Sequence, residues 1–429
     1  MIENPKKNEP AIRFQGFTDP WEQRKFSEVF VGLQNNTLSR ADLNYDQGDI
    51  KNVHYGDVLI KYSEYIDVGS AELPYINDSS IESKFAKSLL EDGDIIIADT
   101  AEDETVGKCC EITNTEGVKL LSGLHTIAVR PQQKYASKFL GYYLNSSAYH
   151  SQLLPLMQGI KVTSISKGAL QDTVLTVPTS IDEQGKIGEC LSNIDDIITL
   201  HQRKCDELKF YKKGLLQHMF PQPGESFPRV RFLGFTDPWE QRKLGSLGSF
   251  KNGMNFSKDA MDKGYPFVNL QNIFGKNVID IENLGLAEAT DNQLKEYSLQ
   301  EGDVLFVRSS VKLEGVGEAA IVPKSLENTT YSGFIIRFRD EVNMDKNFKR
   351  FVFGTKPIRN QIMAKATNSA NKNISQDVLY NLEVYLPPKE EQHKIGAYLA
   401  QLDNLITLYQ RKCDELREYK KGLLQKLFV

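Results

Sequence analysis

The chain has 429 residues, a formal net charge of −5 and 25% charged residues. This length allows two or three domains with proper hydrophobic cores. No apolar run approaches the ~18–20 residues that cross a bilayer, and the first residues, MIENPKKNEP, lack the apolar segment of a signal peptide. The composition therefore indicates an ordinary soluble protein, which we expect in the cytoplasm.

The cysteines also argue against a metal or disulfide framework. There are five, with no C-x-x-C pair and no Cys/His cluster at zinc-like spacing: Cys109, Cys110, Cys190, Cys205 and Cys413. We interpret them as reduced structural thiols and predict no metal site. Adjacent Cys109 and Cys110 are expected to pack on opposite faces of one strand.

A turn-forming segment with a large aromatic anchor occurs twice. RFQGFTDPWEQRK at 13–25 returns as RFLGFTDPWEQRK at 231–243, with twelve of thirteen positions identical. Gly and Pro mark a turn, and the two segments contain the chain's only tryptophans, Trp21 and Trp239. Each segment is predicted to seat a globular domain.

The stretch between each turn segment and the long helix that follows it is predicted to form a mixed α/β domain. In the first, residues 57–62, 94–99 and 126–130 are predicted strands, Ser137 is a predicted N-cap for a helix interrupted near Pro155, and VLTVP at 174–178 leads into the first long helix. The second stretch, 244–388, repeats this plan with little identity. LQEGDVLFV at 299–307 matches LEDGDIIIA at 90–98, and Arg339 matches Arg130 at the same displacement of 209 residues.

Two long amphipathic helices, 182–220 and 390–428, follow the two stretches and share QRKCDEL and YKKGLLQ. Apolar residues recur at steps of three and four, the seam of a coiled coil. In one copy these are Ile187, Leu191, Ile194, Ile198, Cys205, Leu208, Leu215 and Met219; in the other they are Ile395, Leu399, Leu402, Ile406, Cys413, Leu416, Leu423 and Leu427. The two helices can bury each other's seams, although a stalk that dimerises two chains is an alternative. Gly214 and Gly422 suggest close packing or a kink.

Basic residues are concentrated in one part of each half. Residues 117–171 and 346–376 contain no Asp or Glu, whereas residues 91–116 hold nine acidic side chains and one lysine. Each half therefore has a local basic field, despite the acidic total.

The recurring motifs resemble those of a known family, the specificity subunits of type I restriction-modification enzymes. The resemblance rests on P-x(4)-EQ-x-KIG at 178–188, PPKEEQHKIG at 387–396, and the duplicated KKGLLQ and GFTDPWEQRK. It implies an α+β fold with two tandem mixed α/β target recognition domains, each followed by a long helix, the helices pairing as an antiparallel intramolecular coiled coil. The expected boundaries are 1–180 and 223–388 for the recognition domains, and 181–222 (with the linker) and 389–429 for the helices.

The same resemblance implies function and partners. Each recognition domain would read one half of a split double-stranded DNA target. The helices would hold the domains apart and bind two modification (methyltransferase) subunits, which restriction (endonuclease/translocase) subunits would join. This chain would hold no cofactor, while S-adenosylmethionine, ATP and Mg²⁺ would be used by the other subunits.

Candidate DNA-contacting residues lie mainly in the acid-free loops, where cationic, amide and hydroxyl side chains suit base edges and phosphates. In the first domain they are Lys161, Thr163, Ser164, Ser166 and Lys167, then Lys61, Tyr62 and Ser63. In the second they are Lys365, Thr367, Asn368, Asn371, Lys372 and Asn373, then Arg308, Ser309, Ser310 and Lys312. Asp99 and Thr100 stand where the second domain has Arg308 and Ser309, so the two loops are expected to act differently.

The alternatives to this function are an enzyme and a coiled-coil adaptor that binds only proteins. An enzyme lacks support, because GVGEAA at 315–320 runs into IVP rather than a helix, and neither a P-loop nor the Asn/Asp-Pro-Pro-aromatic motif of amino-methyltransferases occurs. We therefore predict no catalysis by this chain alone. A coiled-coil adaptor for proteins only remains the alternative, and it predicts no DNA sequence preference.

Overall fold

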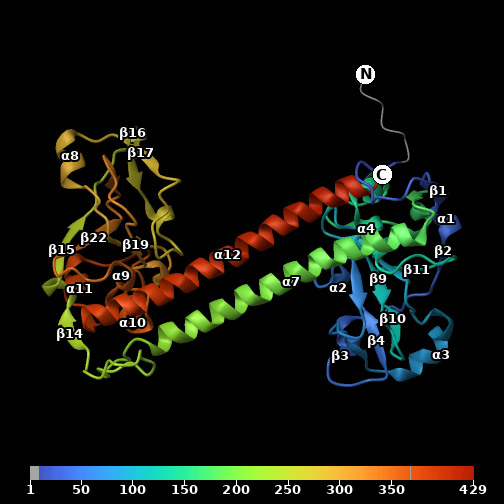
Figure 1. The fold of residues 1–429 in the computed structure, drawn as a ribbon, viewed down its shortest axis with the longest axis horizontal. Coiled ribbons are helices and arrows are strands. Elements are labelled where there is room, and N and C mark those ends of the chain that lie inside the picture. The colour runs from blue at the N-terminus through green and yellow to red at the C-terminus, as the bar shows by residue number, and fades with distance from the viewer. Residues whose placement is uncertain (1–8, 368) are drawn as a thin grey trace. The chain divides into compact units, whose positions relative to one another are not determined.

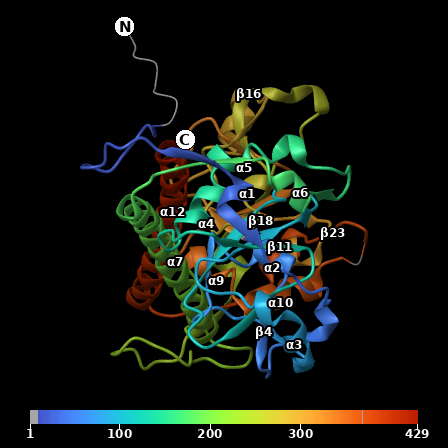
Figure 2. The same cartoon turned by 90° about the vertical axis from the view of Figure 1, so that its right-hand side faces the viewer.

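Two long helices divide the chain where the duplicated sequence predicts them. In the computed structural model, which describes residues 9–367 and 369–429, they are α7 (Ile181–His218) and α12 (Lys389–Leu427) (Figures 1 and 2). Contacts divide the chain into a first unit, residues up to 201 with 411–429, and a second unit, residues 202–410. Each unit thus combines one α/β domain with a part of both long helices.

The first unit is built on a five-stranded sheet of order β2-β11-β7-β9-β5 and a four-stranded sheet of order β10-β4-β6-β3. Two-stranded ribbons, β1-β13 and β8-β12, complete it. Its strands are β1 (Glu22–Lys25), β2 (Phe30–Gly32), β3 (Leu43–Asn44), β4 (Ile50–Val53), β5 (Tyr65–Asp67), β6 (Tyr75–Ile76), β7 (Ile95–Ala98), β8 (Thr100–Ala101), β9 (Cys109–Thr113), β10 (Lys119–Ser122), β11 (Thr126–Pro131), β12 (Thr163–Ser164) and β13 (Val174–Val177). Its short helices are α1 (Phe26–Val29), α2 (Tyr55–Ile60), α3 (Glu82–Phe85), α4 (Phe139–Asn145), α5 (Ser147–His150) and α6 (Lys167–Leu170).

The second unit repeats this plan with a four-stranded sheet, β15-β22-β18-β20, a three-stranded sheet, β17-β16-β21, and the ribbons β14-β24 and β19-β23. Its strands are β14 (Glu240–Lys243), β15 (Gly248–Asn252), β16 (Met261–Val268), β17 (Gly285–Ala287), β18 (Val304–Val307), β19 (Ser309–Ser310), β20 (Ala319–Ile321), β21 (Thr330–Tyr331), β22 (Ile335–Asp340), β23 (Lys372–Asn373) and β24 (Glu383–Leu386). Its short helices are α8 (Asp291–Glu296), α9 (Lys346–Val352), α10 (Lys356–Lys365) and α11 (Gln376–Tyr380). The duplication read from sequence therefore extends to strand pairing.

Apolar side chains cover both faces of the first unit's larger sheet. Ile95 and Ile97 of β7 join one core cluster, while Ile96 and Ala98 join another. Cys109 and Cys110 divide between the same two clusters, which confirms their predicted placement on opposite faces of a strand. An unbroken apolar run is the pattern expected for such a fully buried strand.

The strand predicted at 57–62 is wrong, because residues 55–60 form α2. His54 caps this helix through its ring nitrogen, which accepts from the Gly56 N–H at 3.1 Å, and Asp57 receives a bidentate ion pair from Arg40. Ile60 is 89% exposed, so the short apolar run was not evidence of a strand buried on both faces. Capping and tertiary contacts decide the conformation here.

The helix predicted from Ser137 begins later and breaks earlier. The N-cap of α4 is Lys138, in a left-handed conformation, and the buried Glu111 carboxylate accepts from the Lys138 and Gly141 N–H groups at 2.5 and 3.0 Å. Ser146, in extended conformation, ends the helix well before Pro155. A carboxylate from a distant strand thus satisfies the helix N-terminus, which local sequence could not reveal.

The EQ-x-KIG motif attaches each long helix to its domain. Buried Glu183 and Glu391 accept from Arg13 and Arg231 of the duplicated turn segments, each at 2.7 Å. The next residues, Gln184 and Gln392, bond the backbone before α4 and α9 and the carbonyls of Pro178 and Pro387. These bonds confirm that the turn segments seat the domains.

Glycine in the same motif permits close contact with α4 and α9. A Cβ on Gly188 would lie 3.0 Å from the Ser137 oxygen, and one on Gly396 would lie 2.5 Å from the Phe348 nitrogen. The close packing suggested for Gly214 and Gly422 is wrong, because a Cβ at either would meet nothing within 4 Å.

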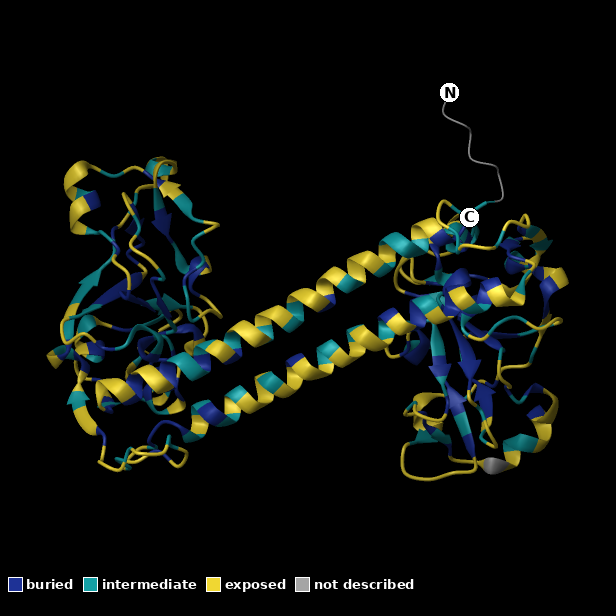
Figure 3. Cartoon of the chain, in the orientation of Figure 1, coloured by how far each residue is buried: buried dark blue, intermediate teal, exposed yellow. Residues whose placement is uncertain are grey.

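The seam residues pair α7 with α12 in antiparallel sense. In the first unit the Cys413 thiol lies 3.7 Å from the Ile198 carbonyl, and in the second the Cys205 thiol lies 3.7 Å from that of Ile406. Residue numbers rise along one helix as they fall along the other. Both cysteines are fully buried, whereas residues off the seam are largely exposed (Figure 3). The predicted intramolecular coiled coil is confirmed.

Each long helix ends inside the core of the other half's domain. Leu427 and Phe428 belong to the first unit's core, where the Phe428 ring lies 6.0 Å from Phe139 and 5.5 Å from Tyr143. Met219 and Phe220 fill the matching place in the second unit. The two halves therefore exchange core residues. Within the part of the chain described, no helix is long and apolar enough to cross a membrane.

Candidate nucleic-acid interface

Each unit brings its two candidate loops together in a two-stranded ribbon. In the first unit β8 pairs with β12, so that Ser164 lies opposite Thr100. In the second, β19 pairs with β23, with Ser309 opposite Asn373 and Ser310 opposite Lys372. Segments some sixty residues apart in sequence thus form one element of mostly half-buried residues, and the major groove of B-DNA admits a two-stranded ribbon of this kind.

Most of the candidate side chains are accessible. The exposed ones are Lys61, Ser63, Lys161, Ser164, Ser166, Lys167, Lys312, Lys365, Thr367 and Asn371, and the half-buried ones are Thr163, Arg308, Ser309, Ser310, Lys372 and Asn373. Asn368 lies outside the described residues. The lysines flanking the ribbons provide positive charge of the kind that binds phosphates.

Three of the candidates that have structural partners bear on where the interface lies. Tyr62 is buried and donates its hydroxyl to the Glu72 carbonyl at 3.0 Å, so it does not face a ligand. Lys61 binds the same carbonyl at 2.6 Å, and the Ser166 hydroxyl caps α6 by accepting from the Ala169 N–H at 3.1 Å. We therefore centre the candidate interface on the ribbons rather than on residues 61–63.

Residues that the sequence did not single out stand beside each ribbon. In the first unit, His125 contacts Asp99 and Thr100, with nitrogen to oxygen distances of 3.3 and 3.4 Å. Phe334 takes the equivalent position in the second unit, where its carbonyl accepts from the Arg308 N–H. Both residues directly precede a strand at the 209-residue displacement, a signal that was available in the sequence. The two ribbons therefore present different chemistry.

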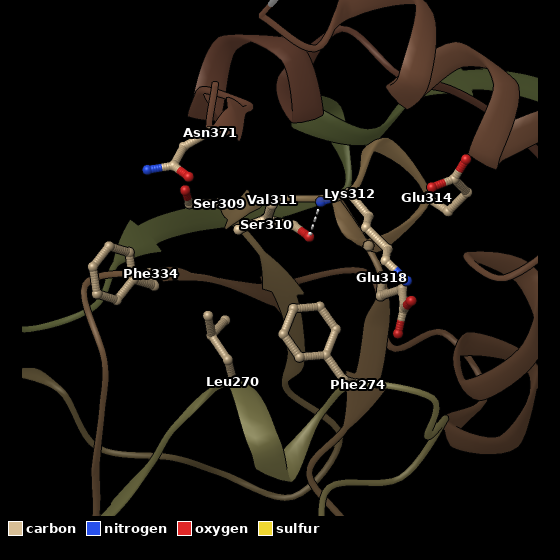
Figure 4. A pocket seen from close by; sticks show the side chains of 11 residues that line it. Leu270, Phe274, Ser309, Ser310, Val311, Lys312, Glu314, Glu318, Phe334 and Asn371 are labelled. Carbon is tan, nitrogen blue, oxygen red and sulfur yellow. Dashed lines mark hydrogen bonds between the residues drawn. The ribbon is translucent and has the colours of Figure 1, made fainter. Parts of the chain in front are cut away.

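A cavity of about 550 Å³ opens beside the second ribbon. Leu270, Phe274 and Phe334 form apolar walls, and Ser309, Ser310 and Asn371 contribute polar groups (Figure 4). Among the residues that the structure describes, no three or more His, Cys, Asp or Glu side chains form a cluster that could hold a metal ion.

An aspartate on each long helix holds the recognition domain to both helices. Asp403 of α12 binds Lys212 of α7, Arg350 of α9 at 2.6 Å, and Asn277 at 3.1 Å. In the first unit, Asp195 of α7 binds Lys420 of α12 at 2.8 Å and the Tyr142 hydroxyl of α4 at 2.5 Å. Burial lowers the pKa of Arg350, so this guanidinium depends on its carboxylate partner.

We expect Asp403→Asn to destabilise the second unit by about 2 kcal/mol, because it leaves two largely buried cations without their counter-charge. Asp206→Asn on α7, whose side chain is 60% exposed, is the control and should change stability by less than about 0.5 kcal/mol. Urea unfolding measures both variants. Equal losses of stability in Asp403→Asn and Asp206→Asn would contradict the expected role of Asp403.

A second candidate surface repeats along the long helices. α7 exposes Ile197, Leu200 and Tyr211, and α12 exposes Leu405, Leu408 and Tyr419 at positions displaced by 208 residues. Lys204 and Glu207, like Lys412 and Glu415, are exposed between them. Exposed apolar residues therefore recur at matching positions of the two helices.

The duplicated α/β domains, the paired helices and the two ribbons define a tandem-repeat protein whose two ribbons carry different side chains at matching positions. The chain belongs to the type I restriction modification DNA specificity domain family, whose sequence model matches residues 18–209 and again 236–418.

Individual relatives agree with this assignment. The putative type I restriction enzyme MjaX specificity subunit of Methanocaldococcus jannaschii is 29% identical over 52% of this chain and 50% of its own length. The EcoKI specificity subunit of Escherichia coli K12 is 22% identical over 64% of this chain and 60% of its own length. The chain thus spans half to three-fifths of these two relatives. The crystal structure of the M. genitalium type I restriction-modification S subunit matches with a TM-score of 0.53 and 14% identity, over 98% of this chain and 99% of that one, and so shares the fold.

Proposed function

We propose that this chain is the non-catalytic DNA-specificity subunit of a type I restriction-modification complex and reads a bipartite target, one half-site per unit. The observation that carries the proposal is the pair of equivalent ribbons, β8-β12 and β19-β23, with different side chains at matching positions. Two equivalent scaffolds with different reading groups are what a target with two different half-sites requires.

The charge distribution supports DNA as the ligand. Lys161 and Lys167 flank the first ribbon, Lys312 and Lys365 flank the second, and all four are exposed. Contacts of such lysines with phosphates supply affinity and orientation, while the ribbon side chains supply sequence preference. Family membership supports the same ligand.

The repeated apolar rows on α7 and α12 support docking of two modification subunits, which restriction subunits would join. These partners would supply the methyltransferase and nuclease chemistry, with S-adenosylmethionine, ATP and Mg²⁺ as their cofactors. In this arrangement α7 and α12 act as a spacer, and the complex works in the cytoplasm, as the sequence predicts.

The proposal is tested by methylome sequencing of a methylation-free host that carries this chain together with its modification subunit. A split adenine-methylated motif is expected only when both proteins are present. The control is the same host carrying the modification subunit alone. Methylation by that subunit alone, or none from a demonstrably assembled complex, would contradict the proposal and favour the protein-only adaptor.

Exchanging residues 26–180 for those of another family member assigns the half-sites. The half of the motif read by the first unit should change, while the half read by residues 244–388 stays the same. An unchanged motif would again favour the adaptor.

A further inference from the structure

The cavity beside the second ribbon combines an apolar wall with an unengaged amide. Phe334 is 58% exposed and Val311 is 77% exposed, a large apolar area for a protein surface. Figure 4 shows Asn371 at the rim above Phe334, while Leu270 and Phe274 line the far wall. The exposed Asn371 amide makes no hydrogen bond to another residue that the structure describes. This cavity is therefore built to contact a ligand with one apolar and one polar side.

Phosphate is a poor occupant. Glu314, Glu318 and Lys312 line the same cavity, so its carboxylates outnumber its one cation, and the Glu318 carboxylate accepts from the Gly275 N–H at 2.8 Å. Two carboxylates repel a phosphodiester. A neutral base edge fits better, since it satisfies the amide and covers the aromatic wall.

An A·T pair has this combination of groups in the major groove. Adenine presents N7 and the N6 amino group, which an Asn amide binds in bidentate fashion, and thymine presents its 5-methyl group, which contacts apolar side chains. From this match, and resting on the proposed function, we infer that the second unit reads an A·T pair, with Asn371 on adenine and Phe334 against the thymine methyl group.

The first unit provides an internal comparison. His125 replaces Phe334 there and contacts Asp99 and Thr100, so no aromatic hydrocarbon wall stands at that position. The inference therefore applies to one half-site only, the one read by the second unit.

The test measures binding of the assembled complex to synthetic duplexes that carry the motif found by methylome sequencing. Each thymine of the second half-site is replaced in turn by uracil, which removes only the methyl group. At one thymine we expect binding to weaken about four-fold, the equivalent of ~0.8 kcal/mol for one methyl-sized group. Replacing its paired adenine by 7-deazaadenine, which removes N7, should weaken binding about ten-fold.

Two variants link these effects to the named residues. Phe334→Ala should abolish the response to uracil and keep the response to 7-deazaadenine, whereas Asn371→Ala should do the reverse. Leu233→Ala, which truncates an apolar side chain that is 97% exposed and does not line the cavity, is the control and should change neither response.

The inference is overturned if the second half-site contains no A·T pair, if no thymine responds to methyl removal, or if Phe334→Ala weakens binding to the thymine and uracil duplexes equally. A complex without any sequence preference would remove the proposed function as well. A complex that reads both half-sites while both variants keep both responses would overturn this inference alone.

Discussion

A chain carrying Ile198→Asp and Ile406→Asp is expected to lose assembly with the modification subunits proposed as its partners, while both α/β domains stay folded. Each substitution places a carboxylate in the seam, where the Ile198 and Ile406 carbonyls lie against Cys413 and Cys205 of the opposite helix. Both isoleucines are half-buried, so an unpaired charge there costs less than the several kcal/mol of a fully buried one, and each lost isoleucine contact adds at most about 1.5 kcal/mol. The double variant should therefore separate the helices along the seam.

Size-exclusion chromatography with the modification subunits measures the loss, and circular dichroism checks that the domains remain folded. The matched control is Thr199→Asp with Thr407→Asp, which adds the same charges at exposed positions one residue further along each helix. This control should assemble normally. Unchanged assembly of the seam variant would contradict the intramolecular coiled coil.

Truncating the penultimate residue is expected to unfold the first unit selectively. Phe428 is 4% exposed and packs on Phe139 and Tyr143. Phe428→Ala should cost about 3–5 kcal/mol, because it leaves a cavity in a core that the rest of that sequence half cannot fill. Phe220→Ala should do the same to the second unit, where Phe220 packs on Trp239 and Phe348.

Hydrogen exchange locates the effect. In Phe428→Ala the amides of β7 and β11 should lose protection while those of β18 and β22 keep it, and Phe220→Ala should give the opposite pattern. Phe210→Ala, which truncates a side chain that is 81% exposed, is the control and should stay within about 0.5 kcal/mol of the native chain. Equal loss of protection in both units would contradict the exchange of core residues between halves.

Several features of the fold were predictable because they depend on repeated local patterns. The 3.6-residue periodicity and the shared QRKCDEL and YKKGLLQ segments predict α7 and α12 within one or two residues of their observed ends. The strands β7, β11 and β18 were likewise expected, because apolar runs bounded by glycine or aspartate are typical of buried strands.

Elements whose conformation depends on distant partners were not predictable. Residues 55–60 form a helix rather than a strand because His54 caps it and Arg40 pairs with Asp57. α4 begins at Phe139 because Glu111 of β9 satisfies its N-terminus. In both cases the group that determines the conformation lies outside the stretch of sequence from which the prediction was made.

The candidate interface was predicted in part. Charge and residue type selected the loops around residues 161–167, 308–312 and 365–373, and strand pairing joins them in two ribbons. His125 and Phe334 were missed. Their equivalence at the 209-residue displacement was available in the sequence, but an isolated ring before a strand does not indicate its own exposure. Tyr62 was selected although its hydroxyl is occupied by the Glu72 carbonyl.

The sequence by itself determined that this protein is a tandem duplication with two α/β domains, two long helices with complementary seams and two basic loop regions, since repeats and periodicity are properties of the linear chain. Only the tertiary structure decided that each helix ends in the other half's core, that Asp195 and Asp403 each bind groups from both halves, and which side chains surround each ribbon. These features depend on contacts between segments that lie nearly three hundred residues apart, such as those of Phe139 and Phe428. The physical reason they escape the sequence is that burial and pairing are set by which surfaces meet, not by local pattern.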